Sequence, residues 1–181
     1  MNKQADALFT KSDKISIEMV TLTYGTFVAR LLKENDNAEE VNLQLLKIGT
    51  NMGSRLIDEF LAKSTRGACQ DLKEIAEVIA KMGFKAYLGV TADVVNWSED
   101  GNSFSLQYED PLAEFVMLPM HLQQSLWYSN LICGVIKGAL EKINVNVECE
   151  FKKDKLRGND TNEIRVTLIE MVKDKYEDDE M

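Results

Sequence analysis

The residues best suited to chemistry in this chain are its three cysteines, Cys69, Cys133 and Cys149, and its single histidine, His121. A cysteine thiolate is a good nucleophile and can carry an acyl group. The cysteines are odd in number and widely spaced, which argues against a disulfide framework or a metal site. The sequence also contains no glycine-rich phosphate loop and no serine elbow. We therefore expect no metal and no catalytic residues.

Cys69 differs from the other two cysteines in its expected surroundings. Asp71 marks the start of a helix, so Cys69 lies just outside an N-terminus whose dipole favours the thiolate. Cys133 is expected on the apolar side of a helix and Cys149 on the inner face of a strand, both as inert core thiols. A Cys69–His121 pair, as in a cysteine acyltransferase, is a further possibility, although no motif orients His121.

Small residues follow Cys69 at helical spacing, and a seam of this kind leaves a groove along a helix. About 14 residues of helix span roughly 21 Å, the length of an extended sixteen-carbon chain. Burying such a chain would contribute about 11 kcal/mol. Close packing of a neighbouring element against the small residues is the alternative explanation. The expected acyl channel is lined by Leu72, Ala76, Ile79, Gly83 and Ala86.

The elements that must position these residues follow from the spacing of apolar side chains. Steps of three and four predict helices over 15–33, 37–60, 71–89 and 124–142. Alternation predicts strands over 94–97, 104–108, 145–151 and 164–168, the first two forming a hairpin. The order ααα-ββ-α-ββ predicts an α+β fold, in which a four-stranded antiparallel sheet is covered by helices.

Composition places these elements in one domain. The chain has 181 residues, of which 45% are hydrophobic, and a net charge of −9 that argues against nucleic-acid binding. We expect a flexible segment over 1–14, a single domain over 15–173 and a disordered acidic tail over 174–181. Charges interrupt the N-terminus and no apolar run could span a bilayer, so we expect a soluble intracellular protein without a signal peptide.

Four stretches of the sequence, taken in order, carry a family resemblance over about residues 15–172. They are Leu22-Thr-Tyr-Gly25, Asn51-Met-Gly-Ser-Arg-Leu-Ile57 with Phe60-Leu61, Cys69, and Tyr128-Ser-Asn-Leu-Ile-Cys-Gly134 with Gly138-Ala-Leu-Glu141. Together they resemble the small core subunits of the TRAPP vesicle-tethering complex, specifically the Bet-three type.

This resemblance implies an α/β plait that dimerises with itself or with a related subunit and joins a larger complex. That complex tethers vesicles from the endoplasmic reticulum at the cis-Golgi and catalyses nucleotide exchange on a Rab GTPase. The chain alone is then not an enzyme. It would be cytoplasmic and would associate with endoplasmic reticulum and cis-Golgi membranes peripherally, through the complex.

The resemblance also implies roles for particular residues. The cysteine matching Cys69 can carry a palmitoyl chain in an internal channel. Palmitoylated members can have an arginine immediately before that cysteine, whereas this chain has Ala68, with Arg66 two positions earlier. The C-terminus can approach the nucleotide pocket of the Rab, which points to the acidic residues Glu177, Asp178, Asp179 and Glu180.

Two expectations concern association. The first two helices have more apolar residues than one stripe requires, which favours a dimer interface that includes Phe27, Leu31 and Leu45. A thicker core is the alternative explanation. A free-standing module of the same fold that binds an acyl chain or another small ligand is the competing function.

Overall fold

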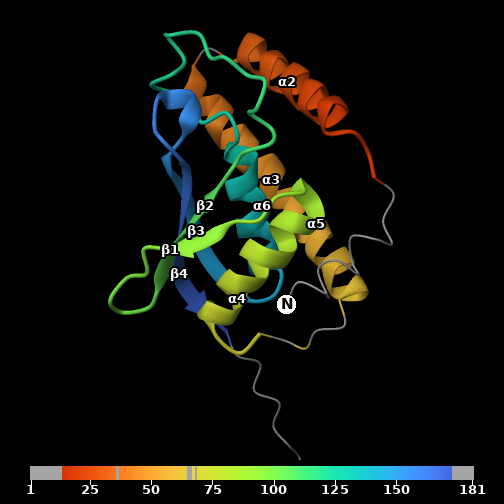
Figure 1. Ribbon diagram of the computed structural model, residues 1–181, viewed down its shortest axis with the longest axis vertical. Helices are drawn as coiled ribbons and strands as arrows, with labels where there is room; N and C mark the ends of the chain where they lie inside the picture. The colour runs from red at the N-terminus through yellow and green to blue at the C-terminus, as the bar shows by residue number, and fades with distance from the viewer. Residues whose placement is uncertain (1–13, 36, 65–66, 68, 173–181) are drawn as a thin grey trace, which may run out of the picture.

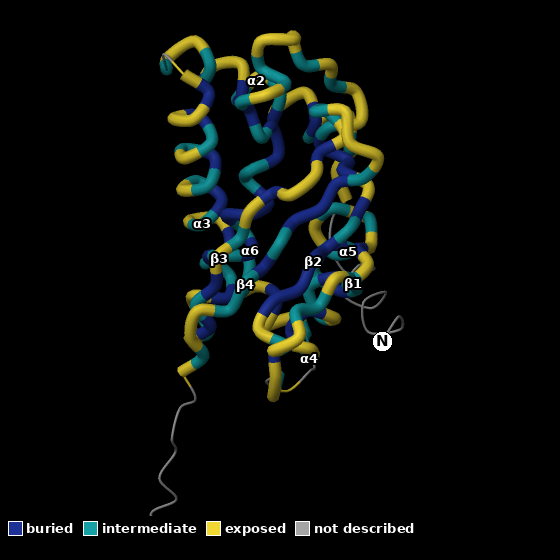
Figure 2. The backbone as a smooth tube through the Cα atoms, turned by 90° about the vertical axis from the view of Figure 1, so that its left-hand side faces the viewer, coloured by how far each residue is buried: buried dark blue, intermediate teal, exposed yellow. Residues whose placement is uncertain are grey.

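Helices cover one face of a four-stranded antiparallel sheet, as Figures 1 and 2 show from two directions. This architecture comes from a computed structural model that describes residues 14–35, 37–64, 67 and 69–172. It confirms the predicted α+β class and the predicted order of helices and strands. The elements are α2 (Ile17–Glu34), α3 (Ala38–Lys63), α4 (Leu72–Val78), the π-helix η1 (Ile79–Gly83), α5 (Phe84–Leu88), β1 (Asp93–Val95), β2 (Ser103–Tyr108), α6 (Asn130–Glu141), β3 (Val145–Lys153), the 3-10 helix η2 (Lys155–Arg157) and β4 (Asn162–Met171).

Side-chain caps start the first three helical regions. The side chains of Ser16, Asn37 and Asp71 accept hydrogen bonds from backbone N–H groups three residues further on. These bonds satisfy donors that a helix N-terminus otherwise leaves without a partner. The helix start expected at Asp71 is therefore confirmed, and Asn37 caps the helix predicted over 37–60. Within the described ranges, no helix combines the length and the apolar character needed to cross a bilayer.

The third helical region, predicted from the sequence as one helix over 71–89, is not a regular α-helix throughout. Its middle turn, η1, is π-helical, and the region ends at Gly89, which has a φ of 75°. A second segment crosses η1 closely: the Ala92 N–H donates to the Ala80 carbonyl at 2.9 Å. The Lys81 ammonium in turn donates to the Ala92 carbonyl at 2.6 Å. The wide turn is thus tied to the chain that leads into β1.

The sheet has the strand order β1-β2-β4-β3, and every neighbouring pair is antiparallel. Residues that alternate along β2 and β4 point to the helices: Phe104 lies opposite Val166 and Leu106 opposite Ile164. All four side chains are fully buried. The predicted hairpin and the two later strands are confirmed. The strands β2, β3 and β4 extend a few residues beyond the predicted bounds, whereas β1 ends at Val95, two residues earlier than predicted.

The helix predicted over 124–142 begins later, at Asn130. The side chain of Asn42, on α3, explains the shorter helix. Its amide donates to the Ser125 carbonyl at 2.8 Å, and its carbonyl oxygen accepts from the Trp127 N–H at 2.8 Å. These bonds hold residues 125–127 in turns, although their apolar spacing is compatible with a helix.

Helices α3 and α6 cross in direct backbone contact. A Cβ atom added to Gly49 would lie 2.1 Å from the Leu131 carbonyl oxygen, and one added to Gly138 would lie 2.0 Å from that of Thr50. Gly53 and Gly134 face the opposite backbone in the same way. Gly134 and Gly138 lie four residues apart on α6, so both face the same neighbouring element. The partner is α3.

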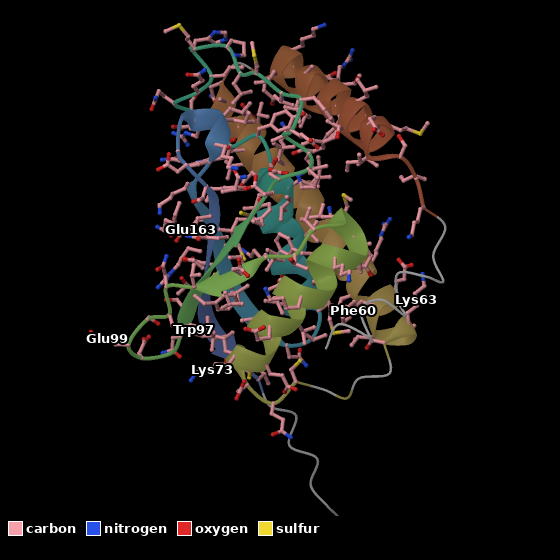
Figure 3. All side chains as sticks on the ribbon, viewed as in Figure 1. Phe60, Lys63, Lys73, Trp97, Glu99 and Glu163 are labelled. Carbon is pink, nitrogen blue, oxygen red and sulfur yellow. The ribbon has the colours of Figure 1, made fainter. Side chains whose placement is uncertain are left out.

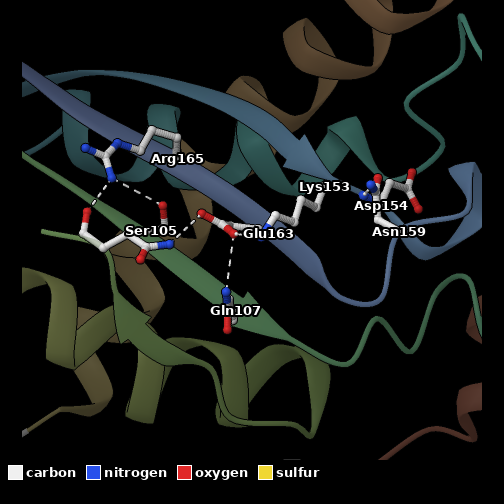
Figure 4. Close-up of polar contacts among 8 residues, drawn as sticks. Ser105, Gln107, Lys153, Asp154, Asn159, Glu163 and Arg165 are labelled. Atoms are coloured by element: carbon white, nitrogen blue, oxygen red, sulfur yellow. Dashed lines mark hydrogen bonds and ion pairs between the residues drawn. The ribbon is translucent and has the colours of Figure 1, made fainter.

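The outer face of the sheet has a polar network centred on Glu163 (Figure 4). Its carboxylate accepts from the Asn96 amide at 3.0 Å and the Gln107 amide at 3.2 Å, and it pairs with Lys153 at 3.2 Å. Burial of this group favours the neutral acid, but side-chain hydrogen bonds outweigh it and lower the pKa of Glu163 to about 2. The network fastens β1 and β2 to β4 on the face without helices.

A second polar cluster lies inside the domain, where α2 meets the start of the loop after β2. The Tyr24 hydroxyl donates to the Tyr128 carbonyl at 2.6 Å, and the Thr21 hydroxyl donates to the Pro111 carbonyl at 3.3 Å. Asp110 is buried beside these contacts and accepts from the Leu112 N–H at 2.9 Å. Burial raises the pKa of Asp110 to about 6.

The helix crossing leads to a first prediction. Gly138→Ala should destabilise the protein by about 3 kcal/mol, because the new methyl group meets backbone atoms that cannot move without separating α3 from α6. Gly67→Ala is the matched control, since a Cβ added there meets no atom of the described residues within 4 Å. Urea unfolding monitored by circular dichroism measures both. Equal stability of the two variants would contradict the contact.

The raised pKa of Asp110 leads to a second prediction. The folded state holds a proton on this carboxyl more tightly than the unfolded chain, so the resulting stabilisation is present at low pH and is lost as pH rises through about 6. The free energy of unfolding should therefore fall by about 1 kcal/mol more in wild type than in Asp110→Asn between pH 5 and 7.5. Denaturant titrations at both pH values measure this difference, with the exposed Asp160→Asn as control. Parallel pH profiles for wild type and Asp110→Asn would exclude it.

Candidate lipid-attachment site

Cys69 lies in the segment that connects α3 to α4, two residues before the Asp71 cap. It is half-buried and packs against the edge of the main hydrophobic core. The cap next to it is double: Asp71 accepts from the Glu74 N–H at 2.8 Å, and the Glu74 carboxylate accepts from the Gln70 N–H at 2.8 Å. The start of α4 thus places this thiol at the boundary between core and solvent. Arg66 and Ala68 lie outside the described residues.

The five residues expected to line an acyl channel occupy two different environments. Leu72 and Ala76, on α4, are buried in the main core, with exposures of 6% and 0%. Ile79, Gly83 and Ala86 are half-buried. The π-helical turn adds a residue to its hydrogen-bonded ring, so it rotates the positions after it relative to regular α-helical spacing. The predicted seam is therefore not one straight stripe.

Gly83 has space beside it, in contrast to the glycines of the helix crossing. Among the described residues, a Cβ atom added to Gly83 would meet one atom within 4 Å, the Val78 carbonyl oxygen at 3.9 Å. Close packing was the alternative explanation for the small residues after Cys69. At Gly83 no neighbouring backbone requires the absence of a side chain. Substitution there would fill space rather than force two elements apart.

The apolar side chains around this turn form a group that is separate from the main core. Phe60, near the end of α3, and Met82 of η1 are buried together, with Ile57 and Val78 packed against them. Figure 3 shows Phe60 between the end of α3 and the helical region that begins with α4. A domain usually has one contiguous apolar core, with smaller satellite groups beside it. Here the layer between α3 and η1 is divided into two groups.

The other two cysteines are unsuited to acylation. Cys133 is fully buried, and burial raises the pKa of its thiol well above the usual value. Burial also raises the pKa of the half-buried Cys149 to about 12. Both thiols are therefore neutral at physiological pH. Cys133 thus lies in the core as expected, whereas Cys149 on β3 is only partly buried.

The structure does not bring Cys69 and His121 together. The loop between β2 and α6, which contains His121, lies at the upper end of the molecule in Figure 1, whereas the N-terminus of α4 lies near the lower end. The two residues therefore cannot form a nucleophile–base pair. Within the described part of the chain, no group of His, Cys, Asp and Glu residues is arranged to hold a metal ion.

The residues expected at a dimer interface are placed unequally. Leu31 and Leu45 are buried in the chain's own core, with exposures of 7% and 0%. Phe27 is half-buried and lines a shallow hollow on α2. Leu22, in the same hollow, is 72% exposed, and Met19 is 63% exposed. Both are large apolar residues that lie off the buried stripe of α2. That position in the helical repeat is the sequence signal that would have identified them as exposed residues.

The acidic residues expected to contact a Rab, Glu177, Asp178, Asp179 and Glu180, lie outside the described residues.

The sequence and the fold both match known proteins. A family model described as "Transport protein particle (TRAPP) component" matches residues 20–167. Trafficking protein particle complex subunit 3 of Dictyostelium discoideum is 48% identical over 179 residues, covering 96% of each chain. Transport protein particle subunit bet3 of Schizosaccharomyces pombe is 46% identical over 175 residues, covering 96% of this chain and 95% of its own.

A solved structure agrees with these relatives. It is a trafficking protein particle complex subunit 3 from Naegleria fowleri covalently bound to palmitic acid. It superimposes with a TM-score of 0.85 at 48% identity and covers 89% of this chain and 99% of its own. The order of elements, the single-faced sheet and the similarity over nearly the whole length lead to one conclusion: this chain belongs to the TRAPP component family.

Proposed function

We propose that the chain is a core subunit of a TRAPP-type complex that tethers vesicles in transport from the endoplasmic reticulum to the Golgi. The observation that carries this proposal is the 43–48% identity to subunits named as components of trafficking particles, over nearly the whole chain. In this role the chain is not an enzyme by itself. It contributes a surface to nucleotide exchange on a Rab GTPase and reaches endoplasmic reticulum and cis-Golgi membranes through the assembled complex.

Within this role, we propose that Cys69 carries a palmitoyl group by a thioester bond. A structure of 48% identity is covalently bound to palmitic acid. In this chain the Cys69 side chain packs against the core, Gly83 has free space beside it, and the apolar residues around η1 are divided into two groups. An acyl chain would join these groups and act as part of the core. Ile79, Gly83 and Ala86 would line it, together with Leu72 and Ala76 nearer the thioester.

We further propose that α2 pairs with a related subunit, or with a second copy in the isolated chain. Exposed apolar side chains that rim a hollow are typical of a subunit interface. Leu22 and Met19 supply the exposed area, and Phe27 lines the hollow. Leu31 and Leu45 support this surface from beneath, because they hold α2 and α3 on the core.

Acylation gives a third prediction. Intact mass spectrometry of wild type should show one added palmitoyl group that hydroxylamine removes, and Cys69→Ser should lack it. Gly83→Leu should reduce the acylated fraction several-fold, because the new side chain fills the space that the lipid would occupy, while circular dichroism shows a folded domain. Cys149→Ser is the control and should keep the added mass. Unmodified wild type, or normal acylation of Cys69→Ser, would exclude this site.

Complex membership gives a fourth prediction. In size-exclusion chromatography of native extract, the chain should elute with other complex subunits, far above its own 20.5 kDa. A free-standing ligand-binding module would elute near the size of a monomer or dimer.

Truncation from residue 174 should leave assembly intact and slow Rab nucleotide exchange, because it removes the acidic tail. Replacing Glu177, Asp178, Asp179 and Glu180 by their amides should slow exchange similarly. Unchanged exchange would remove the tail from the mechanism.

A further inference from the structure

The loop between β2 and α6 carries apolar side chains that its own domain does not cover. Phe115 is 65% exposed, Met117 is 93% exposed and Met120 is 86% exposed. The three residues lie within six consecutive positions. Their loop is at the end of the molecule opposite the start of α4 (Figure 1). Single exposed apolar residues are ordinary, but a group of three large ones on one loop is typical of an interaction site.

The loop has a defined conformation, because alternate residues anchor it to the domain. Val116, Leu118 and Leu122 pack against the main core from the same segment. The Gln123 side chain donates to the Leu118 carbonyl at 3.1 Å, and the Leu122 N–H donates to the Pro119 carbonyl at 2.9 Å. The outward residues are therefore presented by a structured loop. Binding at such a loop requires little ordering, and methionine side chains adapt easily to a partner's shape.

The charge of the loop indicates what kind of surface it meets. Residues 109–124 contain no Lys or Arg, whereas Glu114 is exposed directly beside Phe115. Lys155 reaches the loop but pairs with Glu109, at 2.8 Å. Arg157 also reaches it, where its guanidinium donates to the Gln124 carbonyl. An apolar tip with an acidic rim is poorly suited to the anionic cytoplasmic surface of a membrane. It is complementary to an apolar protein segment flanked by basic residues.

We propose that Phe115, Met117 and Met120 form a docking surface for an apolar segment, flanked by Lys or Arg, of another subunit of the complex. This surface is distinct from the exposed side of α2 and would join the chain to a further neighbour. The inference rests on the proposed membership of the complex. The outward side chains enter the partner's apolar surface, and Glu114 pairs with its basic flank.

Site-specific photo-crosslinking in the assembled complex tests this surface. A benzophenone amino acid is placed at Met117 in the tagged full-length chain, and the complex is isolated by size exclusion before irradiation. Ile169, which is 63% exposed on β4, is the matched control position. Mass spectrometry identifies the crosslinked peptide. We expect crosslinks from position 117 to a Lys- or Arg-flanked apolar peptide of one other subunit, and none to that peptide from position 169.

A charge variant tests the rim. In the background with benzophenone at position 117, Glu114→Lys should lower the yield of this crosslink about fivefold, and Glu114→Gln should lower it less, because the first change repels a basic flank. Crosslinks to lipid, or no crosslink within an intact complex, would overturn the docking surface and leave membership standing. Elution of the chain outside any complex would overturn the proposed function and this inference with it.

Discussion

Direct contact between the backbones of α3 and α6 determines how the helical layer is built. At Gly49 and Gly138 the backbone of the opposite helix lies so near that even a methyl group has no room. At this crossing glycine backbone packs directly on backbone, without intervening side chains that could change rotamer. The two helices are therefore expected to behave as one rigid unit. α6 contacts α3 on one side and β3 on the other, where its apolar residues pack in the main core. The close crossing of α3 and α6 therefore also sets the distance from α3 to the sheet.

The packing of α3 against the helical region α4–η1–α5 differs from its packing against α6. The helical region after Cys69 is not bound to α3 by glycine contacts. It meets α3 through a small apolar group that includes Phe60 and Met82, apart from the main core. The π-helical turn lies at this place, and its free space is at Gly83. π-Helical turns cost stability and occur frequently at functional sites. The irregular turn thus lies in the helical region that follows the candidate lipid-attachment cysteine.

Polar groups organise the surfaces that apolar packing leaves open. The network around Glu163 holds the outer face of the sheet, where Arg165 donates to the Ser103 hydroxyl at 2.5 Å. Because of these contacts Ser103 and Ser105 are buried, although the alternation along β2 assigns them to the solvent side. On the opposite side, polar contacts fasten α2 to the loop after β2 through Tyr24 and Thr21. The outward-facing apolar residues of α2 and of that loop remain uncovered.

The sequence by itself determined the fold class, the order of helices and strands, and the starts of two helices. It also determined that Cys69 lies just before the start of a helix. These features are local: caps at Asn37 and Asp71 and the spacing of apolar residues act within a few positions of the chain. Tertiary structure decided what depends on contacts between distant segments. Asn42 shortened α6 by bonding to residues more than 80 positions away, and the segment at Ala92 accompanies the π-helical turn. Likewise, only the packed structure separates glycines that touch a backbone, such as Gly138, from one that leaves space, Gly83, because a residue type does not specify what lies opposite it.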